Sequence, residues 1–147
     1  TNFEPYTKYD IVISNKVFED YNGTTLSFTT NDSILPTLLS HIPEQNALNV
    51  SKTQSIILTF SEPIYINPKG SIILYNFYND KILNTFDLEN DDEIIGSGTN
   101  QITIKNNKYL LSRQKYYLLI ANNTFHNDTN NFYEGIRDKN MFVFKIS

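Results

Sequence analysis

The sequence has no cysteine, no tryptophan, and only two alanines and two arginines among its 147 residues. Without cysteine it has no disulfide framework, no thiolate metal site and no cysteine nucleophile. No run approaches the roughly 18 apolar residues of a membrane span, and no basic start precedes an apolar run, so we expect neither a span nor a signal peptide within these residues. The net charge is -4 and the 12 lysines and arginines are dispersed, which excludes the basic footprint of a nucleic-acid-binding protein.

Asparagine, isoleucine and aromatic residues are abundant instead, with 20 Asn, 18 Ile, 10 Tyr and 10 Phe. β-branched and aromatic residues favour strands, whereas scarce alanine disfavours helices. Short alternating runs, separated by Asn, Asp, Gly and Pro, are typical of an all-β sandwich or barrel. We predict about seven antiparallel strands, at residues 37–42, 55–60, 70–75, 81–86, 101–105, 116–121 and 141–146, with an earlier strand pair at 10–14 and 25–29. The run at 55–60 is expected to end at Ser61-Glu62-Pro63.

An internal repeat aligns residues 8–18 with residues 115–125 without gaps. Five of the eleven positions are identical, and each copy continues through an Asn/Asp-rich turn into a strand containing phenylalanine. The period, 115 minus 8, is 107 residues, which matches the size of one immunoglobulin-like β-sandwich. The repeat predicts that residues 1–32 are the closing hairpin of a preceding sandwich plus the start of a linker. Residues 33–147 are then a complete immunoglobulin-like domain.

Several segments of the second copy carry a recognisable pattern, of which Thr-Phe-Ser-Glu-Pro at residues 59–63 is the most distinctive. The segments lie at residues 36–43, 46–50, 57–64, 70–74 and 111–144. They resemble the bacterial Ig-like domain found in S-layer proteins and tandem surface adhesins. The resemblance covers residues 36–147, and residues 1–30 match the closing half of that family again. It implies a non-catalytic, extracellular spacer or adhesion module without an active site.

The turn of this family, Asp-x-x-Gly-Asn, is preserved in the first copy as Asp20-Tyr21-Asn22-Gly23. In the second copy the corresponding segment reads Asn127-Asp128-Thr129-Asn130-Asn131. Because the leading aspartate and the glycine are both replaced, the resemblance carries no turn-specific ligand over to the second copy.

Two groups of acidic and amide side chains are candidate cation sites. The first has five carboxylates in seven residues, enough oxygen ligands for Ca²⁺, although it does not fit an EF-hand loop and a solvated loop is the alternative. This first group is Asp87, Glu89, Asp91, Asp92 and Glu93. The second group would converge at the junction between repeats, and consists of Glu19, Asp20, Asn31, Asp32 and Glu62.

Aromatic residues form a third candidate site, because Tyr75, Phe77 and Tyr78 cluster at one predicted strand end. Tyr116 and Tyr117 begin another predicted strand and extend this aromatic strip. Exposed rings there would stack on sugars, whereas the alternative is that they fill the core or cover a sheet edge. Four cations within residues 105–115 indicate a solvated face or, alternatively, a surface for an anionic partner.

No catalytic residue is assigned. The two histidines, His41 and His126, are too few for a typical zinc site without cysteine. Ser61, His126 and Asp128 have the side chains of a hydrolase triad, but no nucleophile elbow or oxyanion loop accompanies them. We therefore expect that the protein is not an enzyme.

The pattern as a whole favours a structural module of a tandem array on a cell surface or in an extracellular filament. Its partners would be neighbouring modules or copies of itself, and it needs no cofactor unless Ca²⁺ binds. The alternative is an adhesin module that recognises a glycan or a protein through its aromatic loop. The predicted core consists of Leu58, Phe60, Ile73, Ile102, Ile104, Leu118, Ile120, Phe142 and Phe144.

Overall fold

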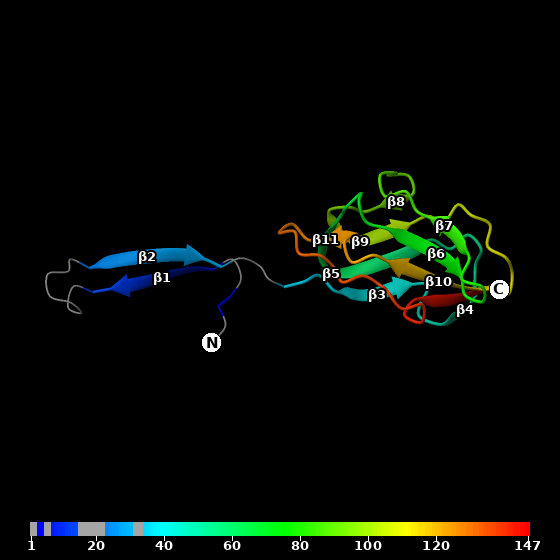
Figure 1. Cartoon of the computed structure of the whole chain (residues 1–147), viewed down its shortest axis with the longest axis horizontal. Coiled ribbons are helices and arrows are strands. Elements are labelled where there is room, and N and C mark those ends of the chain that lie inside the picture. The colour runs from blue at the N-terminus through cyan, green and yellow to red at the C-terminus, as the bar shows by residue number, and fades with distance from the viewer. Residues whose placement is uncertain (1–2, 5–6, 15–22, 31–33) are drawn as a thin grey trace. The chain divides into compact units, whose positions relative to one another are not determined.

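The computed structural model of the chain describes residues 3–4, 7–14, 23–30 and 34–147 (Figure 1). The chain divides into two compact units, Thr1–Ile34 and Leu35–Ser147. All elements of regular secondary structure in the described part are β-strands. The described residues form no helix that could cross a membrane.

The first unit contains an antiparallel hairpin of β1 (Lys8–Ile13) and β2 (Thr24–Thr29), close to the predicted strand pair. Tyr9 pairs with Phe28, and Ile11 pairs with Leu26. Because these positions alternate along both strands, the four side chains share one face. Phe3 joins them, with its ring centroid 4.7 Å from Tyr9 and 5.3 Å from Phe28. Ile11 and Leu26 are 50% and 55% exposed, so the described part of this unit leaves the apolar face uncovered.

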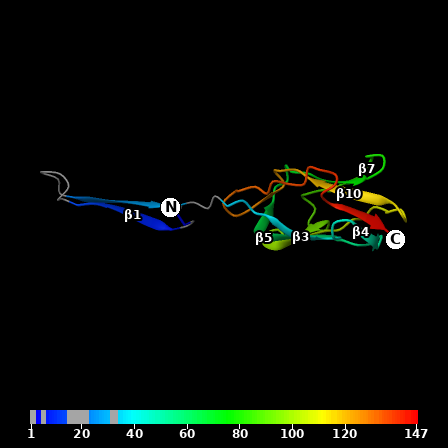
Figure 2. The same cartoon turned by 90° about the horizontal axis from the view of Figure 1, so that it is seen from below.

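The second unit is a sandwich of two sheets. One sheet has the strand order β4-β12-β10-β6-β7, and the other has the order β11-β5-β9-β8 with β3 also paired to β5. Figure 2 shows β10 and β7 in one layer and β3 and β5 in the other. The strands are β3 (Leu38–Ile42), β4 (Ala47–Val50), β5 (Ile56–Ile66), β6 (Ile72–Asn76), β7 (Ile82–Thr85), β8 (Ile94–Ile95), β9 (Thr99–Ile104), β10 (Lys115–Ile120), β11 (Phe125–His126) and β12 (Val143–Ile146).

The central strand β5 continues past the point where the sequence predicts its end. It alternates buried and partly exposed residues from Ile56 and then runs through Ser61-Glu62-Pro63 to Ile66. The prediction of a break was wrong because the ladder with β9 shifts register between Thr59 and Ile64. Proline is tolerated in such an irregular stretch, since its missing N–H removes no regular ladder bond there.

Three strands of the sandwich were missed by the prediction, namely β4, β8 and β11. The last two are only two residues long, too short for a periodic signal. β4 is also parallel to β12, whereas β3 is antiparallel to β5. The seven predicted strands pair antiparallel with one another, as expected. The parallel pair involves β4, which the prediction lacks and which lies in the other sheet from β3.

The core lies between the two sheets and is formed by isoleucine, leucine and aromatic side chains. Eight of the nine predicted core residues are buried, and the exception is Ile73. Ile73 points outward because β6 turns Ile72 and Leu74 inward, and both are 0% exposed. The second unit has two sheets with one core between them, and its first two strands, β3 and β4, belong to different sheets. It is therefore an immunoglobulin-like β-sandwich.

Candidate functional site

The aromatic residues singled out in the sequence lie on the outer face of the sheet β4-β12-β10-β6-β7. Tyr75 of β6 pairs with Tyr117 of β10, and their rings stack with centroids 4.9 Å apart and planes 6° apart. Phe77 meets Tyr117 edge-on at 6.1 Å and Tyr78 at 6.0 Å. Tyr78 is 65% exposed, whereas Tyr117 is only 4% exposed. The structure thus gathers Tyr75, Phe77 and Tyr78 around Tyr117.

Two lysines cover this aromatic group. The Lys115 Nζ lies 4.1 Å from the ring centroid of Phe77, and the Lys139 Nζ lies 4.7 Å from the same centroid. Lys139 also donates to the Asp80 carboxylate at 2.9 Å, and the Tyr117 hydroxyl donates to the same oxygen at 3.0 Å. Cation–π contacts of this kind add to the packing of the rings. We call Tyr75, Phe77, Lys115, Tyr117 and Lys139 the Tyr117 cluster.

Tyr117 and its partner Asp80 each keep one protonation state at neutral pH. Burial, with a smaller contribution from the hydrogen bond to Asp80, raises the pKa of Tyr117 to about 12. The hydrogen bond from Lys139 lowers the pKa of Asp80, and the hydrogen bond from Tyr117 lowers it as well. Tyr117 is therefore a neutral donor and Asp80 a charged acceptor.

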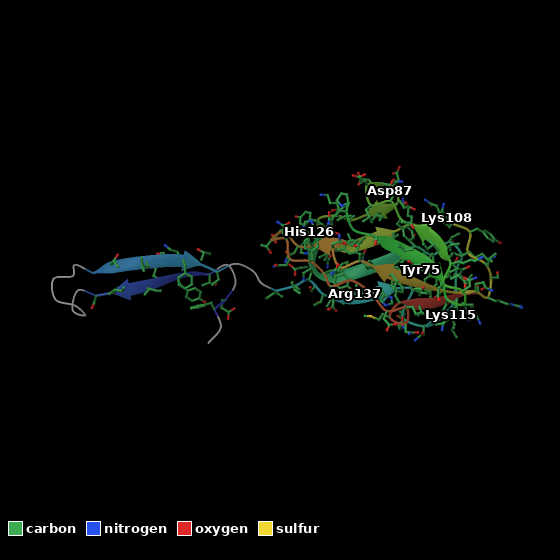
Figure 3. The ribbon with its side chains drawn as sticks, in the orientation of Figure 1. Tyr75, Asp87, Lys108, Lys115, His126 and Arg137 are labelled. Carbon is green, nitrogen blue, oxygen red and sulfur yellow. The ribbon has the colours of Figure 1, made fainter. Side chains whose placement is uncertain are left out.

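Two hollows flank the Tyr117 cluster on this face. One is a groove of about 350 Å³ lined by Ser71, Ile73, Tyr75, Leu119 and Arg137 among others. The other has a volume of about 250 Å³ and is lined by Leu48, Tyr78, Lys115 and Lys145 among others. Figure 3 shows Arg137, Tyr75 and Lys115 in that order along the sandwich, with Asp87 at the top of the view.

A further hollow lies where residues 35–38 enter the sandwich. It measures about 400 Å³ and is lined by Leu35, His41, Tyr133, Glu134 and Met141, among others. Burial raises the pKa of Tyr133 to about 12, with a smaller contribution from the charge of Glu134.

The acidic loop predicted to bind Ca²⁺ connects β7 and β8. Its side chains bond to the loop itself: Asp87 Oδ1 accepts from the backbone N–H of Glu89 at 3.0 Å, and Glu93 Oε2 accepts from that of Asp87 at 3.2 Å. Among the described residues, no three His, Asp or Glu side chains lie where they could hold a metal ion together. The geometry lends the Ca²⁺ prediction no support.

The predicted junction site falls largely on residues that the structure does not describe, since Glu19, Asp20, Asn31 and Asp32 lie outside the described ranges. Its fifth member, Glu62, lies in β5 and accepts from Asn127 Nδ2 at 3.2 Å. Glu62 therefore contacts the turn after β11 within the sandwich, and the junction site stays a prediction.

Asn127 organises the turn in which the family's aspartate is replaced. It is 0% exposed, and its Oδ1 accepts from the Thr129 N–H at 3.1 Å, the Thr129 hydroxyl at 2.9 Å and the Asn131 N–H at 2.9 Å. Asn130 has a φ of 62°, a left-handed conformation that asparagine tolerates. The turn keeps its side-chain hydrogen bonding because the asparagine carbonyl accepts as a carboxylate would.

Both histidines are engaged in local packing. His41 stacks on Phe142 with centroids 3.7 Å apart, and its Nδ1 lies 2.6 Å from the Pro43 carbonyl oxygen. His126 stacks on Tyr65 at 5.8 Å, and its Nδ1 lies 2.7 Å from the Asn127 carbonyl oxygen. Each ring nitrogen donates to that carbonyl and fixes its side chain.

Comparison with known protein families finds a match to the bacterial Ig-like domain over residues 32–145. The chain belongs to this family. The match confirms the expected family at large, but not its S-layer type. The Ig-like sandwich also resembles a solved structure, "The crystal structure of CopC from Methylosinus trichosporium OB3b", with a TM-score of 0.48 and 11% sequence identity over 76% of this chain and 93% of that chain. No curated protein sequence matches the chain.

Sequence reasoning missed Lys139, Arg137 and Lys145 as members of the outer face of this Ig-like domain. It did find Tyr117 as one of the two tyrosines that begin a predicted strand, and inward Tyr116 and Leu118 leave Tyr117 on the outer face. Lys139 and Arg137 lie in irregular chain outside the strands, where no periodicity indicates which surface they reach.

Proposed function

We propose that the chain is a structural module of a tandem array of Ig-like domains in a surface or extracellular protein, such as an adhesin or a filament. In this proposal the hairpin β1–β2 is the closing strand pair of a preceding domain. Its partners are neighbouring domains or further copies of itself, and it acts through spacing and contacts between modules, with no catalytic residue.

The observation that carries the proposal is a shared register. Tyr9 lies opposite Phe28 in the first hairpin, as Tyr116 lies opposite Phe144 in the sandwich. Two residues further along, Ile11 aligns with Leu118 and Leu26 aligns with Phe142. Ile11 pairs with Leu26, and in the sandwich the Leu118 N–H donates to the Phe142 carbonyl. The repeat seen in sequence is therefore matched in strand pairing.

The fourth residues of the two turn motifs, Gly23 and Asn130, have similar backbone conformations as well. Gly23, the last residue of the first-copy turn motif before β2, has a φ of 77°. Asn130, at the corresponding place in the second copy, has a φ of 62°. Both residues are in the left-handed region, which glycine adopts freely and asparagine tolerates.

Burial differs between the copies in the direction that the proposal requires. Leu118, Phe142 and Phe144 are 0%, 0% and 2% exposed. Their counterparts in the hairpin, Ile11, Leu26 and Phe28, are 50%, 55% and 36% exposed. Covering each of them with a second sheet contributes about 1.5–3 kcal/mol for full burial, and a lone hairpin is marginally stable in water.

A longer chain tests the proposal. Extending the N-terminus by about 70 residues of the parent protein should supply the rest of a sandwich of about 100 residues. Amide hydrogen exchange at Ile11 and Leu26 should then slow to the level seen at Leu118, whose own exchange should not change.

Two results would count against the array. The first is a parent sequence without further copies at the 107-residue period given by positions 8 and 115. The second is a longer chain in which Ile11 and Leu26 exchange as fast as before.

A further inference from the structure

The outer face of the sheet β4-β12-β10-β6-β7 holds cations without carboxylate partners. Lys115 and Lys145 lie directly opposite each other on β10 and β12, and both are half-buried. Among the described residues, neither forms an ion pair, since the pairs there are Lys8–Asp10 and Lys139–Asp80. Like charges in facing positions destabilise a sheet. The repulsion between Lys115 and Lys145 therefore lowers stability, and an anionic ligand bound to both would offset that repulsion.

Arg137 adds a third unpaired cation at the far end of the same face. It is exposed and lines the groove of about 350 Å³ together with Tyr75. Of the nearby acids, Asp80 is bonded to Lys139, and Asp138 accepts from the backbone N–H of Asn140 at 2.8 Å. The face is thus basic although the chain as a whole carries a charge of -4.

The shape of the face suits a linear ligand. Six residue steps separate Ser71 in the groove from Phe77 in the Tyr117 cluster, which is about 20 Å along an extended strand at about 3.3 Å per residue. The groove offers the exposed Asn122 amide and the half-buried Tyr75 ring. The second hollow, with Lys115, begins where the cluster ends.

We propose that this face binds an acidic polysaccharide, a linear chain of sugars that carry carboxylates. Arg137 binds one carboxylate in its guanidinium fork, and Lys115 and Lys145 together bind another. Tyr75 and the 65% exposed Tyr78 pack against sugar rings.

The topology favours a polysaccharide over an acidic peptide. β10 lies between β12 and β6, and β6 lies between β10 and β7. The backbone groups of both strands are therefore already paired, so a peptide lying over β10 and β6 cannot add to the sheet there as a further strand. A sugar chain needs only side-chain donors and ring faces, which this face supplies.

The experiment titrates the 147-residue chain with three uronate polymers, polygalacturonate, alginate and hyaluronate, by calorimetry at low salt. Methyl-esterified polygalacturonate is the matched control ligand, because it keeps the sugar chain and loses the charge. We expect binding to at least one uronate polymer, weakening with added salt, and at least tenfold weaker binding to the ester.

Matched variants locate the site. Lys115→Gln with Lys145→Gln, and separately Arg137→Gln, should each weaken binding about tenfold. Lys105→Gln with Lys108→Gln makes the same charge change as the first pair at two exposed positions and should change affinity less than twofold. Circular dichroism and melting temperature establish that each variant is folded.

Three outcomes would overturn the proposal: no binding to any of the three polymers, equal binding to the methyl ester, or equal loss in the control pair. Poly-glutamate that binds as tightly as the best uronate polymer, with the same variant sensitivity, would also overturn it, since the face would then recognise negative charge without the sugar. If a variant unfolds, the comparison of polygalacturonate with its ester on the unmodified chain still decides.

Discussion

Asn127 and Glu62 join the turn after β11 to the middle of β5 by a hydrogen bond of 3.2 Å between Asn127 Nδ2 and Glu62 Oε2. The asparagine is fully buried, and its Oδ1 accepts three further hydrogen bonds within the turn. The amide thus uses both ends, one to close the turn and the other to anchor it to the central strand.

Asn127→Asp should test this anchor. The change keeps the acceptor oxygen, removes the donor to Glu62 and places a second carboxylate beside it. We expect a loss of at least about 2 kcal/mol of unfolding free energy at pH 7. Part of the loss should return near pH 4, because protonation of either carboxyl removes the repulsion. Urea denaturation followed by tyrosine fluorescence or circular dichroism measures the difference.

The control combines Asn127→Asp with Glu62→Gln. The new amide donates to the new carboxylate and reverses the direction of the original hydrogen bond, so stability at pH 7 should recover by about 1 kcal/mol or more. A double variant as unstable as the single one at both pH values would contradict the proposed contact.

Gly135 and Gly98 form a second matched pair, because both have a positive φ, 83° and 85°. A Cβ on Gly135 would lie 2.3 Å from the Ile120 carbonyl oxygen, whereas on Gly98 its nearest neighbour would be Tyr65 Cε1 at 3.6 Å. Gly98→Ala should cost about 1–2 kcal/mol for the left-handed backbone alone. Gly135→Ala should cost about 2 kcal/mol more, since backbone must move. Ile120 and Ile136 exchange two backbone hydrogen bonds of 2.9 Å beside Gly135. Equal losses in chemical denaturation would show that this bridge can shift without loss of stability.

Much of this fold follows from side-chain alternation, and its errors have physical causes. The strand from Ile56 shows the pattern plainly, since Leu58 and Phe60 follow it on the buried face. The same reasoning failed at Ile73, because three consecutive apolar residues from Ile72 to Leu74 fit either face. Only the neighbouring strands decide which of them point inward.

The outer face was harder to predict than the core. Tyr75, Phe77 and Tyr78 are close in sequence and could be grouped, but their neighbours come from β10 and from residue 139. The Lys139–Phe77 contact joins residues that no local pattern relates. The acidic loop shows the reverse case, in which closeness in sequence from Asp87 to Glu93 does not produce convergence in space.

The Tyr117 cluster makes a prediction about pH. The pKa of Tyr117 is raised to about 12, above the ordinary value of about 10. The neutral Tyr117 hydroxyl therefore contributes fully to the free energy of unfolding below about pH 10, and this contribution is lost as the pH rises toward 12. The lowered pKa of Asp80 has its effect at acidic pH. The charged Asp80 carboxylate stabilises the fold above the ordinary pKa of 3.8, and this stabilisation is lost as the pH falls below that value.

Absorbance at 295 nm, where tyrosinate absorbs, can measure this. Two tyrosines should titrate near pH 12, because burial raises the pKa of both Tyr117 and Tyr133 to about 12. Tyr117→Phe and Tyr133→Phe should each remove one tyrosine's share of the absorbance change near that pH. Asp80→Asn should lower the pKa of Tyr117 only in part, because burial is the larger cause. An unchanged titration in Tyr117→Phe would contradict the assignment.

The last prediction compares equivalent positions of the hairpin β1–β2 and the strand pair β10–β12. Leu118→Ala removes a 0% exposed side chain from the core and should cost about 2–5 kcal/mol of the unfolding free energy of the sandwich. Ile11→Ala, at the corresponding position of β1, where the side chain is 50% exposed, should change the same unfolding free energy by less than about 0.5 kcal/mol. If the proposed preceding domain exists, then in a chain extended to include it Ile11→Ala should instead destabilise that domain by an amount close to the Leu118→Ala loss, because a second sheet then covers the side chain. A cost that stays near zero in the extended chain would mean that the two strand pairs share a register without sharing a role.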